Sequence, residues 1–172
     1  MIGPCAIQVG LLSEPWLQPL SSAAFWSLYS LLVGLFANQL PDAWLLRQGV
    51  RQSSNLLNVR PKGLLGIHRW KRWIPDAGNA LPGGISKATL VRRDTDSLLR
   101  LVLETSRAEI VHWALLPAGL ITALWLPTAG VLVNVIFALA FNLPCVLLQR
   151  YNRARLLWFL SRLETIETRF RD

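Results

Sequence analysis

Two long stretches without charge constrain this chain more than any other feature. No Asp, Glu, Lys or Arg occurs from residue 15 to 41, a run of 27 residues, or from 110 to 149, a run of 40. A helix of about 20 apolar residues crosses the ~30 Å hydrocarbon core of a bilayer. The chain is 52% hydrophobic and 16% charged, whereas soluble domains carry about 25% charged residues. We therefore expect an all-α membrane protein rather than a soluble enzyme or a disordered tail.

The charge-free stretches predict about three transmembrane helices within a single membrane domain. The longer stretch has room for two spans, because Pro127 and Gly130 can form a turn between them. The segment after the first span interleaves basic residues with apolar and aromatic ones. This pattern predicts amphipathic helices at the cytoplasmic membrane surface. The predicted organisation of domain 1–172 is a first span at about 21–40, an interfacial segment at 42–107, further spans at about 108–126 and 130–149, and a tail at 150–172.

The basic residues predict the orientation. None of the 18 Lys and Arg residues precedes residue 47; twelve lie between 47 and 107, and six between 150 and 171. The positive-inside rule places both basic segments in the cytoplasm, with the N-terminus outside and the C-terminus cytoplasmic. The net charge of +8 then faces the anionic headgroups of membrane lipids, and no nucleic acid partner is expected.

A first polar cluster, ETSRAEIVHW at 104–113, lies where the second predicted span enters the membrane. Glu109 and His112 are about 60° apart on a helix, and Arg107 can pair with Glu104 three positions earlier. A carboxylate beside an imidazole fixes the tautomer and makes the other ring nitrogen a better base. Such chemistry suits the removal of a proton from a sugar hydroxyl during acyl transfer. The structural alternative is an ion-paired helix end at the level of the headgroups.

A second polar cluster, NLPCVLLQRYNRARL at 142–156, follows the third predicted span into the cytoplasmic border. Its arginines either anchor the topology on lipid phosphates or, together with the neighbouring amides, hold a sugar or an acyl-donor headgroup. Asn142 lies inside the span, where an amide needs a partner. Pro144 frees the carbonyl of Ala140, and we expect Asn142 to help satisfy it.

A third motif, IHRWKRWIPDAG at 67–78, combines basic and aromatic residues. Residues 67–74 fit an interfacial anchor helix, and Trp70 is alternatively a platform on which a sugar can stack. The two cysteines, Cys5 and Cys145, have no metal-ligand spacing. We expect no metal site.

These three motifs, in this order and spacing, resemble the glycosyl-4,4'-diaponeurosporenoate acyltransferase family over roughly residues 20–160. The family pattern is close to ETCRAE-x-x-HW and NxP-x-x-x-QRYNRPRL, so Ser106 and Ala154 stand where the pattern has Cys and Pro. Ser106 excludes an essential thiol nucleophile at that position. The resemblance implies a small protein of the bacterial inner membrane that transfers a fatty acyl chain to the sugar of a glycosylated C30 carotenoid or a related glycolipid. It implies no cofactor beyond the acyl donor, which acts as a co-substrate.

The motifs map to roles that we infer from chemistry. His112 is the predicted general base, with Glu109 as the catalytic residue that orients it. Arg150 and Arg153 are expected to bind the phosphates of the donor or to stabilise an oxyanion. Both polar clusters are expected at the same inner leaflet. The predicted substrate-binding residues are Glu104, Arg107, Gln149, Arg150, Tyr151, Asn152, Arg153 and Trp70.

A second function remains open at this stage. A chain of 172 residues with three short spans leaves little room for an enclosed site with two substrates. Its eight tryptophans can equally pack against a pigment or against partner helices. The alternative is therefore a non-catalytic subunit that binds lipid or pigment and scaffolds a larger membrane-protein complex.

Overall fold

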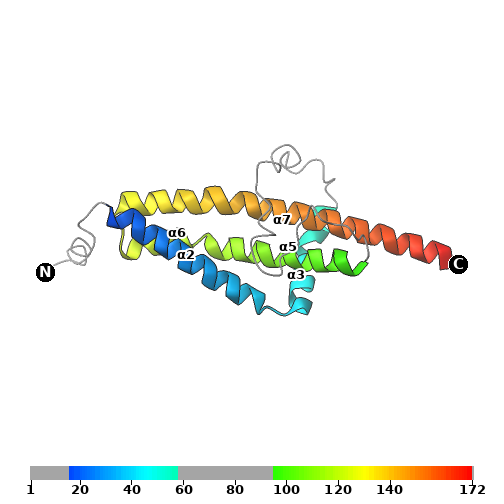
Figure 1. Cartoon of the computed structure of the whole chain (residues 1–172). Helices are drawn as coiled ribbons and strands as arrows, with labels where there is room; N and C mark the ends of the chain where they lie inside the picture. Colours follow the sequence, from blue (N-terminus) through cyan, green and yellow to red (C-terminus); the bar gives the residue numbers. More distant parts are fainter. Residues whose placement is uncertain (1–15, 58–94, 172) are drawn as a thin grey trace. The chain divides into compact units, whose positions relative to one another are not determined.

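The computed structural model describes residues 16–57 and 95–171, with side chains at 16–52 and 95–163. All regular structure in these ranges is helical, which confirms the predicted all-α class. The predicted interfacial helix at 67–74 and Trp70 lie outside the described residues. The elements, drawn in Figure 1, are α2 (Leu17–Asn38), α3 (Asp42–Leu57), α5 (Thr95–Leu115), α6 (Ala118–Ile121), the 3₁₀ helix η5 (Thr122–Leu124) and α7 (Thr128–Arg171).

Two of these helices are long and apolar enough to cross a membrane: α2, and α7 over Thr128–Leu163. They contain most of the first predicted span and all of the third. Both expose large apolar side chains, such as Phe36 on α2 and Val133 on α7, each 66% exposed. Extended apolar surface of this kind is unusual on a protein that faces only water. The two helices indicate that the protein associates with a membrane.

The span predicted at 108–126 is divided among several elements, so the count of three spans is not confirmed. Helix α5 ends at Leu115, and Pro117 precedes the short α6 and η5. Proline has no N–H and its ring clashes with the carbonyl of the preceding turn. The Leu116 N–H accordingly donates to the Trp113 carbonyl three residues back, at 3.3 Å. Pro144, in contrast, lies inside α7, which continues through it.

The turn expected near Pro127 is present, because α7 begins at Thr128 after a short non-helical connection. Helix α5 begins at Thr95, inside the predicted interfacial segment, and continues to Leu115. Beyond the third predicted span, the chain stays helical to Arg171 rather than ending its helix near residue 149.

The chain divides into two compact units, each assembled from separate parts of the sequence. The first comprises Met1–Gln39 and Ile110–Val146, and the second comprises Leu40–Glu109 and Leu147–Asp172. Helices α5 and α7 each contribute residues to both units.

The first unit is packed around aromatic rings. Phe25 stacks on Tyr29 at 5.4 Å between ring centroids and meets the edge of Trp125 at 5.0 Å. Trp26 packs edge-on against Phe137 of α7 at 5.1 Å. Edge and offset contacts are the geometries that aromatic pairs favour. Trp26 and Phe137 therefore help to hold α2 against α7, and Phe25 packs α2 against Trp125 in the connection before α7.

An open groove of about 560 Å³ lies in this unit, beside the rings of Trp26 and Phe137. Its polar members are Gln18, Ser22 and Asn134, and the rest of the lining is apolar. The Trp26 indole and the Asn134 amide are hydrogen-bonded to each other at 2.8 Å. The groove therefore presents a mainly hydrocarbon surface. Its lining residues are Gln18, Pro19, Ser22, Ala23, Trp26, Leu126, Ala129, Gly130, Val133, Asn134 and Phe137.

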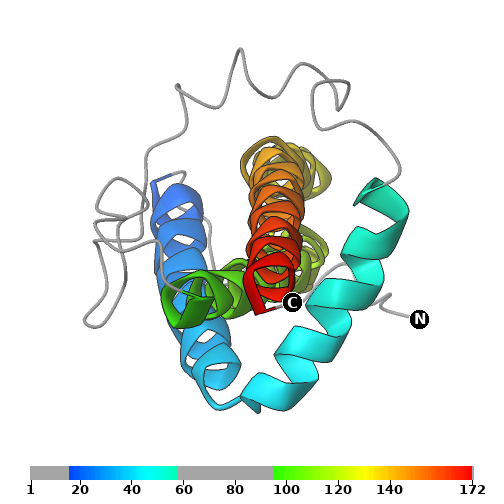
Figure 2. The same ribbon diagram turned by 90° about the vertical axis from the view of Figure 1, so that its right-hand side faces the viewer.

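The second unit is built on the buried face of α5. Leu98, Val102 and Leu160 form its apolar centre. Helices α5 and α7 run in opposite directions (Figure 1), and Figure 2 shows α3 passing beside α7. Along α5 the buried positions recur every three or four residues, as expected for one face of a helix. After Val102 this face becomes polar, because the next buried positions are Thr105, Ser106 and Glu109. The sequence of α5 therefore places a carboxylate at the end of an apolar stripe.

Candidate functional site

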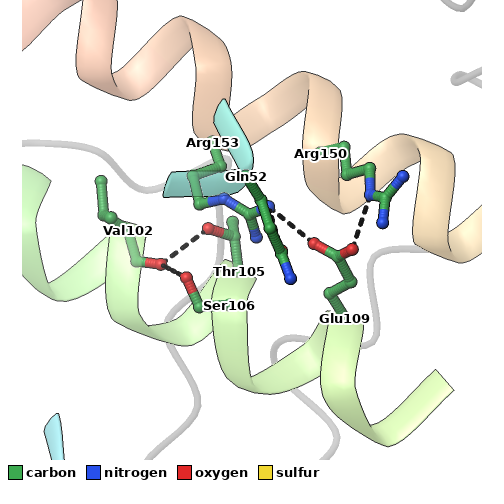
Figure 3. Close-up of polar contacts among 7 residues, drawn as sticks. All are labelled: Gln52, Val102, Thr105, Ser106, Glu109, Arg150 and Arg153. Atoms are coloured by element: carbon green, nitrogen blue, oxygen red, sulfur yellow. Dashed lines mark hydrogen bonds and ion pairs between the residues drawn. The ribbon is translucent and has the colours of Figure 1, made fainter. Parts of the chain in front are cut away.

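A buried carboxylate held by two arginines is the main polar feature of the second unit. Glu109 Oε1 lies 2.6 Å from Arg150 Nε, and Glu109 Oε2 lies 2.7 Å from Arg153 Nη2. Figure 3 shows both arginines of α7 reaching the same carboxylate of α5. The side chains of Glu109 and Arg153 are 2% and 0% exposed, whereas that of Arg150 is 33% exposed. The cluster thus has a closed side and an accessible side.

The spacing of the arginines explains why both reach one carboxylate. Residues three apart lie on the same side of a helix, which is the relation of Arg150 to Arg153. Arg153 Nη2 also donates to Gln52 Oε1 of α3 at 3.1 Å. A single guanidinium therefore links α3, α5 and α7.

A glycine allows α3 to approach this cluster. A Cβ atom at Gly49 would overlap the Ser106 hydroxyl and would lie 3.1 Å from Arg153 Cδ. Ser106 Oγ donates to the Val102 carbonyl at 2.8 Å, and Thr105 Oγ1 donates to the same carbonyl at 2.9 Å. These buried hydroxyls are therefore held by their own helix, and Ser106 fills a packing position beneath Gly49.

The cluster carries an excess of positive charge. One carboxylate and two guanidinium groups sum to +1, counting only these three side chains. Buried charges are tolerated when they are paired and hydrogen-bonded, which is how Glu109 and Arg153 are arranged. Of the three side chains, that of Arg150 is the most accessible. The arrangement can hold three helices together and can attract an anionic group.

A second ion-paired set lies nearer the surface of the same unit. Arg107 Nη1 is 2.6 Å from Glu104 Oε1, the pair that the sequence predicts. Arg107 Nη2 is 3.2 Å from Asp42 Oδ1 at the start of α3. The Asp42 side chain is 69% exposed, and exposed pairs contribute little to stability. These ion pairs therefore contribute more to the position of the first residue of α3 than to the stability of the unit.

The imidazole of His112 belongs to the first unit and has a hydrogen-bond partner on α7. His112 Nδ1 lies 3.0 Å from Asn142 Oδ1, and Asn142 Nδ2 donates to the Ala138 carbonyl at 2.8 Å. The expectation that Asn142 satisfies the Ala140 carbonyl is wrong, because an asparagine on a helix reaches the carbonyl one turn back. The sequence predicts that Glu109 orients His112. In the structure, the residue that hydrogen-bonds Nδ1 of His112 is Asn142.

The remaining predicted residues are placed as follows. Tyr151 is buried, and the Arg155 guanidinium lies 5.8 Å from the centre of its ring. Gln149 and Asn152 are half-buried. Sequence reasoning missed Gln52, since nothing in the chain marks which amide of a polar helix will meet an arginine about 100 residues later.

The described helices hold no constellation of metal ligands. Within residues 16–52 and 95–163, no group of three or more His, Cys, Asp and Glu side chains is arranged to hold a metal ion.

Fold and site together define an all-helical, membrane-associated protein with a buried glutamate–arginine cluster. Comparison with known proteins identifies its family. The sequence pattern of the glycosyl-4,4'-diaponeurosporenoate acyltransferase family matches residues 41–162, which is more than half of the chain. The chain belongs to this family, as the motifs predict.

Two relatives show how far the sequence of this chain has diverged from named members of the family. A glycosyl-4,4'-diaponeurosporenoate acyltransferase of Staphylococcus aureus (strain NCTC 8325 / PS 47) is 27% identical over 147 residues, covering 80% of this chain and 87% of the relative. The protein of that name from Staphylococcus haemolyticus (strain JCSC1435) is 33% identical over 94 residues, covering 54% of each chain. No solved structure matches the chain.

Proposed function

We propose that this protein transfers a fatty acyl chain to a sugar hydroxyl of a glycosylated carotenoid or a related glycolipid, with His112 as the general base. The relatives are named glycosyl-4,4'-diaponeurosporenoate acyltransferases. The observation that carries the proposal on this chain is the half-buried imidazole of His112, held through Nδ1 by Asn142. An imidazole anchored through one nitrogen has the other available for proton transfer.

The proposed reaction has two stages. His112 Nε2 takes the proton of the acceptor hydroxyl as its oxygen attacks the acyl carbonyl of the donor. The bond between the acyl carbon and the leaving group then breaks, and the imidazolium returns the proton to the leaving group. The products are the acylated sugar and the protonated leaving group, so His112 ends the cycle neutral. General base catalysis of this type contributes about 10²–10⁴-fold to the rate.

The glutamate–arginine cluster has a separate place in the proposal. Glu109 and Arg153 hold Arg150 in position, and Arg150 offers positive charge to an anionic group of the acyl donor. Its one-third exposed side chain supports this role. Glu104, Arg107, Gln149, Tyr151, Asn152 and Trp70 remain proposed contacts to substrate.

The proposed setting is the bacterial inner membrane, which the protein crosses more than once. The distribution of basic residues supports an N-terminus outside and a C-terminus in the cytoplasm. The exposed apolar faces of α2 and α7 support contact with membrane lipids.

The test is acyl transfer by the purified full chain in lipid vesicles, with a glycosylated carotenoid acid as acceptor and mass spectrometry of the product. His112→Ala should lower the rate by about 10²–10⁴-fold while leaving membrane insertion intact. Tyr29→Phe is a matched control, because it removes the hydrogen bond from Tyr29 Oη to the Ala114 carbonyl of the same helix as His112 without touching the imidazole. Full activity of the His112→Ala variant would remove His112 from the mechanism.

A second function has its own support. The ring cluster around Phe25 and the groove beside Trp26 and Phe137 offer an apolar surface suited to a lipid or pigment chain. If the purified wild-type chain binds the acceptor but transfers no acyl group, and gains activity only with a copurifying membrane protein, it is a binding subunit of a larger complex.

A further inference from the structure

The side-chain amide of Asn142 has one chemically acceptable orientation. Asn142 is 4% exposed, and its Nδ2 lies 2.8 Å from the Ala138 carbonyl oxygen. A carbonyl accepts but cannot donate, so the amide atom facing it must be the NH₂ group. The opposite orientation would bring two oxygens together in a buried site. The carbonyl oxygen Oδ1 is therefore the atom presented to His112 Nδ1, at 3.0 Å.

A second asparagine of α7 has the same geometry with an unambiguous partner. Asn134 Nδ2 donates to the Gly130 carbonyl four residues back at 2.8 Å, as Asn142 does to Ala138. Asn134 Oδ1 accepts from Trp26 Nε1 at 2.8 Å. An indole nitrogen can only donate. The two asparagines thus each bond their own helix through nitrogen and turn an oxygen toward a ring nitrogen of another helix.

From this geometry we infer that Asn142 is a positioning residue that fixes neutral His112 as the Nδ1–H tautomer. A neutral imidazole carries one hydrogen, so the lone pair then lies on Nε2. Among the residues that the structure describes, Nε2 has no hydrogen-bond partner. Free histidine in water favours the opposite tautomer, so the protein selects the minor form. The tautomer itself does not depend on the proposed function, whereas the catalytic use of Nε2 rests on it.

The same contact suits both states of a base. When Nε2 takes a proton, Nδ1 keeps its hydrogen and its bond to Asn142 Oδ1. The neutral and protonated rings therefore share one position, and no hydrogen bond has to be exchanged during proton transfer. Donors and acceptors that need no rearrangement at the moment of reaction are the ones that lower a barrier most.

Nuclear magnetic resonance of the full chain tests the tautomer directly. The chain has two histidines, so His68→Gln leaves His112 as the single ¹⁵N-labelled imidazole in detergent or nanodiscs. Couplings of the ring nitrogens to the carbon-bound protons should show hydrogen on Nδ1 in the neutral state. Asn142→Leu should shift the population to Nε2–H, and Asn142→Asp should keep Nδ1–H because a carboxylate oxygen accepts. Asn134→Leu is the matched control and should leave the His112 spectrum unchanged.

Kinetics test the positioning role. Asn142→Leu should lower kcat by roughly tenfold or more, within the ~10²–10⁴-fold contribution of the base itself, with KM little changed, and Asn142→Asp should recover part of the loss. A wild-type spectrum with Nε2–H, or an Asn142→Leu spectrum like the wild type, overturns the inference. If the tautomer shifts but activity persists in Asn142→Leu and falls in His112→Ala, Asn142 is not a positioning residue. If activity also survives His112→Ala, the failure belongs to the proposed function.

Discussion

Glu109 and Arg153 bury opposite charges against each other, with Oε2 and Nη2 2.7 Å apart and side chains 2% and 0% exposed. Burying two charges carries a desolvation cost that their attraction offsets only when the remaining polar atoms are also satisfied. Glu109 meets this condition because its second oxygen bonds Arg150. Arg153 meets it only in part: Nη2 also bonds Gln52, whereas the buried Nη1 has no hydrogen-bond partner among the described residues. The pair therefore depends on side chains from three helices, and its loss should lower the stability of the second unit as a whole.

Removal of the charge of Glu109 should destabilise this unit strongly. Glu109→Gln removes the carboxylate that two guanidinium groups share, and one of these groups is fully buried. Breaking a buried pair by removing one partner costs about 3–5 kcal/mol. Thermal or denaturant unfolding in detergent should detect the loss.

Two further variants make this prediction specific. Glu104→Gln should change stability by at most ~1 kcal/mol, because its pair with Arg107 is partly exposed. Glu109→Gln combined with Arg153→Met should be more stable than Glu109→Gln alone, because the buried guanidinium that lost its pair with Glu109 is also removed. Additive losses in the double variant would show that the two side chains are not energetically coupled.

The close approach of α3 gives a second prediction. Gly49→Ala should destabilise the second unit by about 1–3 kcal/mol through overpacking, because the new methyl group meets Ser106 Oγ and Arg153 Cδ. Adding Ser106→Ala removes the first obstacle and should restore part of the loss. Equal unfolding midpoints for Gly49→Ala and the double variant would contradict the close contact between Gly49 and Ser106.

Much of the fold could be predicted from charge and proline placement. The charge-free runs mark α2 and the first part of α7, and the turn before Thr128 follows from Pro127. The break at Pro117 was harder to foresee, since proline is often accommodated inside membrane helices. Pro144 is accommodated in α7 whereas Pro117 ends α5. The difference depends on packing, and the close contact of Gly119 with Val135 occurs just after the break.

Side-chain pairs within one helix could be predicted from the sequence, whereas pairs between helices could not. Spacing within one helix predicts Glu104–Arg107, and the structure contains that pair. Pairs between helices depend on rotation and register that periodicity does not determine, so Gln52–Arg153 and His112–Asn142 were not anticipated. The sequence marks Asn142 as an amide in need of a partner, but the partner that it suggests, the Ala140 carbonyl, is wrong, since the amide bonds Ala138 and His112.

Two glycines give opposite predictions for the same substitution. A Cβ atom at Gly119 would lie 2.8 Å from Val135 Cα, a backbone atom that cannot move aside. Gly119→Ala should therefore push α6 away from α7 and lower the unfolding midpoint. Gly34 in α2 has no atom within 4 Å of its added Cβ, and Ala is favoured over Gly inside a helix by about 0.5–1 kcal/mol. Gly34→Ala should thus be neutral or stabilising; destabilisation by both variants alike would contradict the packing of α6.

The hydrogen bond between Trp26 and Asn134 predicts a loss that a second mutation cancels. Trp26→Phe keeps an aromatic ring beside Phe137 but removes the only group that donates to Asn134 Oδ1 among the described residues. Leaving a buried acceptor unsatisfied should cost about 0.5–2 kcal/mol. Asn134→Leu in the same chain removes the unsatisfied oxygen, so the unfolding midpoint of the double variant should be closer to that of the wild type than the midpoint of Trp26→Phe is.

Unfolding followed by circular dichroism suits both variants, because the signal does not depend on the lost tryptophan. A double variant that is less stable than either single variant would mean that Asn134 stabilises the unit through its contacts to Gly130 and Ser22 rather than through Trp26.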